Sequence, residues 1–123
     1  MTTSPTDELR QAAQTLLDLA DVAQTDLDTG DYWKPYPKAT AWRDGLTNGM
    51  GGASGDLAAV FSPAAAHALA KALRQTEALH TPTTCQHEGC MPHGCEWCGD
   101  EDWPCADLRN ALAVARQINA ASA

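Results

Sequence analysis

The sequence predicts a mostly α-helical fold with a small irregular β-hairpin, arranged as a three-helix core stapled by a cysteine-rich zinc site. Apolar residues repeat at spacings of three and four in three separate stretches, which is typical of helices with one buried face. All five cysteines fall within residues 85–105, which indicates a metal site. Because a chain of 123 residues has the length of one core, we expect a single domain over residues 1–123.

The first helix is predicted over about residues 5–29. Ser4 is a suitable N-cap, Pro5 suits the first helical position, and Asp7 follows at the third. One stripe of this segment is apolar and is predicted to be core, namely Leu9, Ala13, Leu16, Ala20, Ala23 and Leu27. The opposite stripe is acidic, and Gly30 is a plausible end for the helix.

A loop and hairpin region is expected over about residues 32–55. Its first part, from Tyr32 to Arg43, carries four aromatic residues and two prolines, a composition that favours extended chain. Asn48-Gly49 suggests a hairpin turn, so that the hairpin would cover roughly residues 32–48. The glycine-rich stretch that follows lacks the Gly-Lys-Ser/Thr ending of a phosphate-binding loop, and we expect a flexible loop there.

Two further helices are predicted. Ser62-Pro63 supplies a cap and a first-turn proline for a helix over about 63–79, whose many alanines permit close packing. The last helix is expected over about 104–120. It places five apolar residues on one side, Leu108, Ala111, Leu112, Ala115 and Ile118.

The metal-binding segment is residues 85–105, with the cysteine spacing C-x4-C-x4-C-x2-C-x6-C. Cys95 and Cys98 are the first choice, because a C-x2-C turn followed by glycine lets both thiolates reach one ion. Cys105 comes next, since it lies at a predicted helix start, where the helix dipole stabilises a thiolate. Cys90 is the fourth choice. Three further candidates would replace Cys90 or form a second site with it, namely Cys85, His87 and His93.

Zinc (Zn2+) is the expected ion, with an iron–sulfur cluster as the alternative. Four cysteines satisfy either one, and two available histidines favour zinc. Disulfides are not expected, because the cysteine count is odd and the cytosol is reducing. A thioredoxin-like redox pair would need a βαβ context that is missing. The spacing C-x2-C-x6-C with a nearby tryptophan also resembles WhiB-like cluster proteins, although their glycine–tryptophan turn after the last cysteine is absent.

Charge argues against a nucleic-acid-binding finger. The net charge is −8, and no lysine or arginine lies between Arg74 and Arg109, an interval that holds seven acidic residues. Fingers that bind nucleic acid neutralise phosphates with Lys and Arg, so the metal segment should repel DNA and RNA. We expect a structural zinc and a partner that is another protein, with a basic surface. The alternative is an acidic nucleic-acid mimic that inhibits a host DNA-handling or defence protein, and an iron–sulfur regulatory protein is the third hypothesis.

Basic and aromatic residues are interspersed in one stretch, at Tyr32, Trp33, Lys34, Tyr36, Lys38, Trp42 and Arg43. This is the composition of a platform that stacks single-stranded nucleic acid, but three cations are few in an acidic protein. We expect the rings to cover the helical core instead. The chain is not expected to be an enzyme, because no nucleophile motif and no zinc signature with a general base is present.

The start of the chain, Met1-Thr2-Thr3-Ser4-Pro5, has neither a basic start nor an apolar signal segment. There is also no apolar run long enough to cross a bilayer. A cytoplasmic location without membrane contact is therefore expected.

Several residues resemble those of small uncharacterised proteins encoded by phages of actinobacteria and by their hosts. The likeness covers mainly residues 56–118 and rests on the alanine-rich stretch after Ser62-Pro63, on Cys95-x2-Cys98, and on Trp103-Pro104-Cys105 before the last helix. That group has no established activity. The resemblance implies the cytoplasm of a bacterial host and zinc through Cys95, Cys98 and Cys105. These relatives often carry a Gly-Pro-Trp turn after the first helix, from which Tyr32-Trp33-Lys34-Pro35 departs.

Overall fold

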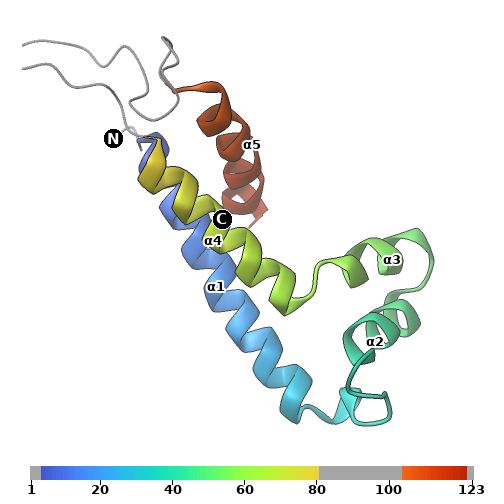
Figure 1. Ribbon diagram of the computed structural model, residues 1–123. Coiled ribbons are helices and arrows are strands. Elements are labelled where there is room, and N and C mark those ends of the chain that lie inside the picture. Colours follow the sequence, from blue (N-terminus) through green and yellow to red (C-terminus); the bar gives the residue numbers. More distant parts are fainter. Residues whose placement is uncertain (1–3, 81–103, 122–123) are drawn as a thin grey trace, which may run out of the picture. The chain divides into compact units, whose positions relative to one another are not determined.

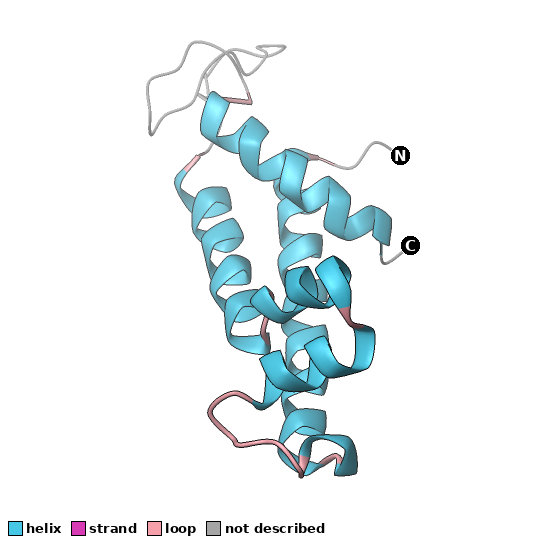
Figure 2. Cartoon of the chain, turned by 90° about the vertical axis from the view of Figure 1, so that its right-hand side faces the viewer, coloured by secondary structure: helices cyan, strands magenta, loops and turns pink. Residues whose placement is uncertain are grey.

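The computed structural model describes residues 4–80 and 104–121, and within these ranges every regular element is a helix (Figures 1 and 2). The chain forms α1 (Pro5–Thr29), the short 3-10 helix η1 (Asp31–Trp33), α2 (Ala41–Met50), α3 (Gly52–Val60), α4 (Pro63–Leu79) and α5 (Ala106–Ala121). None of these helices is long and apolar enough to span a bilayer.

The predicted β-hairpin over residues 32–48 is wrong. No strand occurs between residues 4 and 80 or between 104 and 121, and the expected hairpin region forms η1, a turn and α2. Asn48-Gly49, which was expected to be the hairpin turn, lies inside α2, and the expected glycine-rich loop forms the end of α2 and the start of α3. The predicted fold class, a hairpin beside a three-helix core stapled by zinc, is thereby replaced by an all-helical arrangement of the described residues.

Packing against aromatic rings explains why this glycine-rich stretch is helical. A Cβ atom built on Gly45 would lie 2.4 Å from a ring carbon of Trp33, and one on Gly49 would lie 2.8 Å from the hydroxyl of Tyr32. The glycines therefore let α2 approach the two rings of η1 closely. Contacts of this kind override the low helix propensity of glycine, which costs about 1 kcal/mol per residue relative to alanine.

A break between α2 and α3 is set by Gly51 and Gly52, whose φ angles are 72° and 57°. Residues with a Cβ rarely adopt such angles. After the break α3 packs on α2, and Gly55 makes this close: a Cβ there would lie 3.2 Å from the carbonyl oxygen of Leu46.

The starts of α1 and α4 follow the capping signals in the sequence. The Ser4 hydroxyl accepts a hydrogen bond from the Asp7 backbone N–H at 3.2 Å, and the Ser62 hydroxyl accepts one from the Ala65 backbone N–H at 3.1 Å. Each bond satisfies a backbone donor that the first helical turn leaves unpaired. The bounds of both helices coincide with the predicted ranges.

The chain divides into two compact units, to which α1 and α4 each contribute. The first unit comprises Met1–Thr15 and Ala70–Ala123. Its buried apolar side chains come from the start of α1, the end of α4, the residue before α5, and α5 itself, namely Leu9, Ala12, Ala13, Ala70, Leu73, Cys105, Leu108, Leu112 and Ala115. Burying each leucine stabilises the fold by about 1.5–3 kcal/mol.

Polar contacts join the same three helices of the first unit. The Arg116 guanidinium donates to both carboxylate oxygens of Glu8, each at 3.1 Å, and the Asn119 side chain donates to the Glu8 backbone carbonyl at 3.1 Å. Arg10 of α1 pairs with Glu77 of α4. These ion pairs are partly exposed, so they fix how the helices align with one another more than they add to the stability of the fold.

The second unit comprises Leu16–Leu69. Its buried apolar residues are Leu16, Ala20, Trp33, Ala41 and Ala66. Within this unit α1 and α4 are also joined by His67, whose Nε2 lies 3.0 Å from an Asp21 carboxylate oxygen.

Candidate functional site

One of the predicted metal ligands, Cys105, lies in the part of the chain that the structure describes. The others fall outside it, within residues 81–103, namely Cys85, His87, Cys90, His93, Cys95 and Cys98. The zinc and iron–sulfur predictions for those residues therefore stay predictions from the sequence.

Cys105 is fully buried and directly precedes α5. Its carbonyl accepts the hydrogen bond from the Arg109 backbone N–H at 2.8 Å, which is the first helical bond of α5. The thiol thus lies at the positive end of a 16-residue helix, where a negative charge such as a thiolate is favoured. This agrees with the placement that the sequence predicts for Cys105.

A histidine that the sequence analysis did not select lies beside this thiol. His80 directly follows α4, and its Nδ1 atom is 3.2 Å from the Sγ atom of Cys105. The His80 side chain is 6% exposed, which is rare for a polar group without a structural or chemical role. A buried imidazole and a buried thiol are therefore in direct contact between the end of α4 and the start of α5.

A carboxylate lies on the other side of the imidazole ring. The Oδ2 atom of Asp107, in the first turn of α5, is 3.8 Å from the Nε2 atom of His80. This is ion-pair distance but too long for a direct hydrogen bond. If the ring carries its proton on Nε2, the nitrogen beside this carboxylate, the lone pair lies on Nδ1, the nitrogen that faces Cys105.

The chemistry of this group suits a metal better than a nucleophile. Cys–His–Asp is also the order of groups in cysteine hydrolases, but a nucleophilic thiol has to be reached by substrate, and Cys105 is 0% exposed. Cysteine and histidine are the usual ligands of zinc. Among residues 4–80 and 104–121 no group of three or more potential ligands occurs, so the described pair offers two donors and not a complete site.

His80 was not predicted as a metal ligand, because it lies outside the C-x4-C-x4-C-x2-C-x6-C pattern and directly follows an alanine-rich helix. Its position gives a signal in retrospect. It stands five residues before Cys85, immediately before the segment that the cysteines occupy. Spacing alone cannot distinguish it from His87 and His93, which are closer to the cysteines in sequence.

The aromatic stretch covers the core of the second unit, as the sequence analysis expected for its rings. Trp33 is 8% exposed, stacks on Trp42 with ring centroids 5.5 Å apart, and meets Tyr32 edge-on at 5.0 Å. Its indole N–H donates to the Asp26 carboxylate at 2.8 Å. A buried and hydrogen-bonded Trp33 is not available to stack on a nucleic-acid base.

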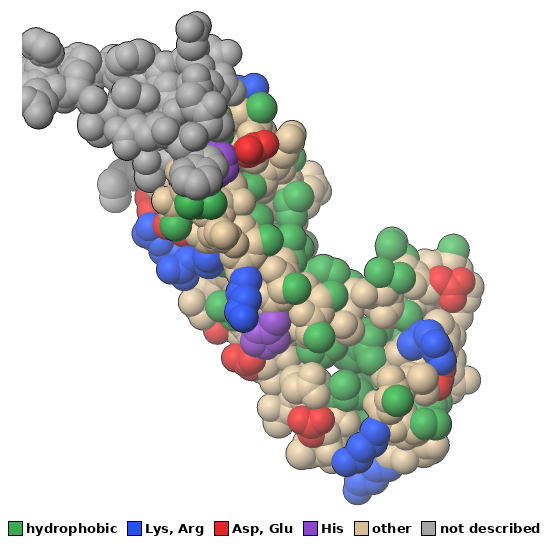
Figure 3. All heavy atoms as spheres, in the orientation of Figure 1, with side chains coloured by type: hydrophobic (Ala, Val, Ile, Leu, Met, Phe, Trp, Pro, Cys, Tyr) green, Lys and Arg blue, Asp and Glu red, His purple; other side chains and the backbone are tan. Residues whose placement is uncertain are grey.

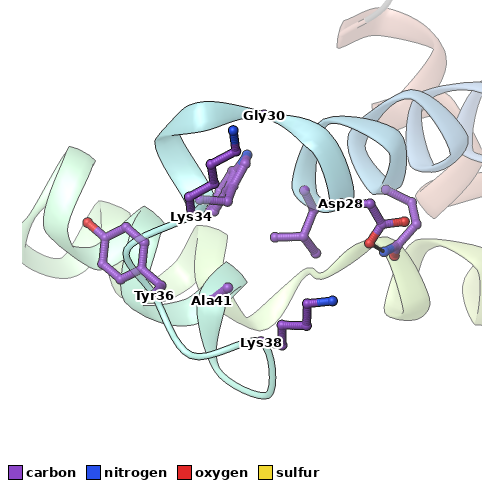
Figure 4. Close-up of a pocket in the computed structure, with 9 residues that line it drawn as sticks. Asp28, Gly30, Lys34, Tyr36, Lys38 and Ala41 are labelled. Carbon is purple, nitrogen blue, oxygen red and sulfur yellow. Dashed lines mark hydrogen bonds between the residues drawn. The ribbon is translucent and has the colours of Figure 1, made fainter.

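A pocket of about 250 Å³ lies beside these rings, between the end of α1 and the turn after η1 (Figure 4). Asp28 and Tyr36 lie on opposite sides of it, and Lys34 and Lys38 reach toward it between them. Lys34 pairs with Asp31 at 2.6 Å, and both lysines are exposed. Exposed charges are screened by salt, so the pocket does not form a strong anion site.

Two side chains near the rings have shifted pKa values. Interaction with the Tyr36 hydroxyl raises the pKa of Tyr32, and burial acts in the same direction. The hydroxyl of Thr40, which precedes α2, donates to Asp44 at 2.7 Å and lowers the pKa of that carboxyl group. Both groups belong to the second unit, where these interactions have structural roles.

The chain was compared with known proteins. No family model matches it, and no curated protein or solved structure matches it either.

Proposed function

We propose that this chain is a small acidic zinc-binding protein that acts by binding another protein, with the zinc ion in a structural role. The single observation that carries the proposal is the contact between Cys105 and His80. His80, which precedes the cysteine-rich segment, and Cys105, its last cysteine, place metal-binding atoms together in a buried position. The resemblance to phage proteins supports the same kind of protein in a bacterial cytoplasm.

A structural role follows from the position of the pair. His80 and Cys105 are separated by 25 positions, and bringing the ends of such a segment together costs conformational entropy. A metal ion held by thiolates within the segment would offset that cost, as closed zinc sites do in small domains. Such a site has no open position for substrate.

Zinc is favoured over an iron–sulfur cluster by the histidine. Clusters are usually held by four cysteines, whereas mixed cysteine and histidine sites are common for zinc. The two differ in colour, because iron–sulfur clusters absorb visible light and zinc sites do not.

An exposed apolar surface on α3 supports the interaction role. Leu57 and Val60 are 76% and 77% exposed, and Phe61, directly after the helix, is 44% exposed. Figure 3 shows hydrophobic side chains over the part of the molecule that contains α3. Large apolar side chains that are exposed together are typical of protein-binding surfaces, and we assign this surface, Leu57–Phe61, to a protein partner.

The acidic nucleic-acid mimic is the second candidate, and the described carboxylates favour it less. Mimicry needs carboxylates that present continuous negative charge. Three acidic residues of α1 instead bind within the chain: Asp21 contacts His67, Asp26 accepts from Trp33, and Asp28 accepts from Gln24. Acidic and basic side chains are also interspersed on the face in Figure 3.

The first experiment determines the metal. Purified protein is analysed for zinc and iron, and its visible spectrum is recorded. We expect bound zinc and no visible absorption. Iron with a visible chromophore would replace the proposal by an iron–sulfur protein, and protein without metal after growth with added zinc would refute it.

The second experiment tests the partner surface. Tagged wild-type protein and the variant Leu57→Asp/Val60→Asp are used for cross-linking in host cells. We expect the wild-type protein to be cross-linked to a partner protein and the variant not to be. Binding of that partner to wild-type protein should persist at high salt. Binding that salt abolishes and that the variant retains would favour the acidic mimic, and dimers of this chain alone, seen in sedimentation, would contradict a separate partner.

A further inference from the structure

We infer that His80 is a metal ligand, binding through Nδ1 together with the thiolate of Cys105. This inference rests on the proposed function and names a ligand that lies outside the cysteine pattern. It also makes His87 and His93 unnecessary as the histidine ligand.

The distance between the two donor atoms fits a shared ion. In a tetrahedral site with Zn–S of about 2.3 Å and Zn–N of about 2.0 Å, the sulfur and the nitrogen lie about 3.5 Å apart. The Sγ atom of Cys105 and the Nδ1 atom of His80 are 3.2 Å apart, so a small side-chain rotation brings them to that separation. The thiol of Cys105 and the Nδ1 atom of His80 already face each other.

Burial gives the second argument. The side chain of His80 is almost completely enclosed, and so is that of Cys105. Closed zinc sites hold their ligands away from water, and the enclosure of both side chains matches a site of that kind.

The position of Asp107 gives the third argument, because its carboxylate lies near the nitrogen that does not face Cys105. Metal-binding histidines commonly direct their other ring N–H to a carboxylate, which fixes the tautomer and the ring orientation. The Oδ2 atom of Asp107 lies 3.8 Å from Nε2, on the side where such a carboxylate belongs. Asp107 is a positioning residue and not a ligand, since the two ring nitrogens point in opposite directions.

His67 provides a matched control. It also has a carboxylate partner, since its Nε2 lies 3.0 Å from Asp21, but its side chain is 41% exposed and belongs to the second unit. A second control replaces the two histidines that the sequence suggests, as His87→Ala/His93→Ala.

The test uses cobalt(II) in place of zinc, because its visible spectrum reports the number of thiolate ligands. We expect the full chain to bind cobalt with tetrahedral d–d bands. The change His80→Ala should weaken binding by on the order of 100-fold or more, at least the loss that removal of an outer-shell partner causes. The variants His67→Ala and His87→Ala/His93→Ala should keep the wild-type affinity and spectrum.

The change His80→Cys covers the case in which His80→Ala does not fold. Under reducing conditions it should bind cobalt with stronger sulfur-to-metal charge transfer and with d–d bands at longer wavelength, because a thiolate replaces the imidazole. Nitrogen-15 NMR of the zinc form should show His80 protonated at Nε2 and not at Nδ1.

The outcomes separate the two proposals. A wild-type chain that binds no cobalt and no zinc overturns both the proposed function and this inference. A wild-type chain that binds metal while His80→Ala and His80→Cys leave its spectrum and affinity unchanged overturns only the inference. A cobalt spectrum that changes only in His87→Ala/His93→Ala would also overturn only the inference. The histidine ligand would then be one of that pair.

Discussion

The Sγ atom of Cys105 lies 3.2 Å from the Nδ1 atom of His80, although the two residues are 25 positions apart in the sequence. The contact is made between the residue that follows α4 and the residue that precedes α5, and both side chains are buried. It brings together the two ends of a segment that contains the other four cysteines.

Removing the metal should lower the stability of the folded chain. A ligand that binds only the folded state stabilises it by about 2.7 kcal/mol when its free concentration is 100 times its Kd. We therefore expect a strong chelator to lower the melting temperature of wild-type protein, measured by circular dichroism at 222 nm, a wavelength at which all the described helices absorb. The variant Cys95→Ser/Cys98→Ser should melt at the lower temperature with or without chelator. Equal melting of wild-type protein in zinc and in chelator would contradict a structural metal.

Truncating Leu108 should destabilise the first unit. Leu108 is fully buried on α5, and replacing a buried leucine by alanine costs about 2–5 kcal/mol through lost transfer energy and the cavity that remains. Val114, on the same helix, is 40% exposed, so Val114→Ala is the matched control and should cost well under 1 kcal/mol. Urea unfolding would measure both. A cost for Leu108→Ala no larger than that of the control would show that α5 does not pack as described.

Replacing Gly45 by alanine should destabilise the second unit, although alanine favours helices. The added Cβ would lie 2.4 Å from a ring carbon of Trp33, a distance that no relaxed structure accepts. Overpacking of this kind costs about 1–3 kcal/mol. Combining Gly45→Ala with Trp33→Leu should remove part of that cost, because the smaller side chain makes room. Additive effects of the two changes would contradict the contact.

The pH dependence of stability should reveal the contact between Thr40 and Asp44. The hydroxyl of Thr40 lowers the pKa of Asp44 from its ordinary value of 3.8. A carboxyl group with a lowered pKa stabilises the folded state above the unfolded pKa and loses this effect as the pH falls through the folded pKa. Thr40→Val should therefore be less stable than wild type at neutral pH, and the difference should shrink below about pH 4. The variant Thr47→Val, which alters a threonine within α2, should not show that shrinkage. A constant difference for Thr40→Val would contradict the prediction.

The sequence predicted the long helices well because their signals are local. Ser4 and Ser62 mark helix starts by side-chain caps, and the spacing of Leu9, Leu16 and Leu108 identifies buried faces. The region 32–55 was predicted wrongly because its helices depend on contacts between segments. Gly45 and Gly49 lie where a loop and a hairpin turn were expected, but they are the residues that let α2 approach Trp33 and Tyr32.

The candidate site was predicted only in part for a related reason. Cys105 belongs to a visible cysteine pattern, and its place at a helix start follows from the local sequence. His80 belongs to no pattern, and only the approach of α5 to the end of α4 brings it beside the thiol. The remaining predicted ligands lie outside the described residues.

The most direct test of the central claim is the metal content of the purified wild-type chain, measured by native mass spectrometry beside that of Cys95→Ser/Cys98→Ser. If thiolates of this chain hold zinc, the wild-type mass should include at least one zinc ion, and the variant should lack it. A wild-type chain of apo mass after expression in zinc-supplemented medium, or a variant that retains the same zinc content, would contradict the account.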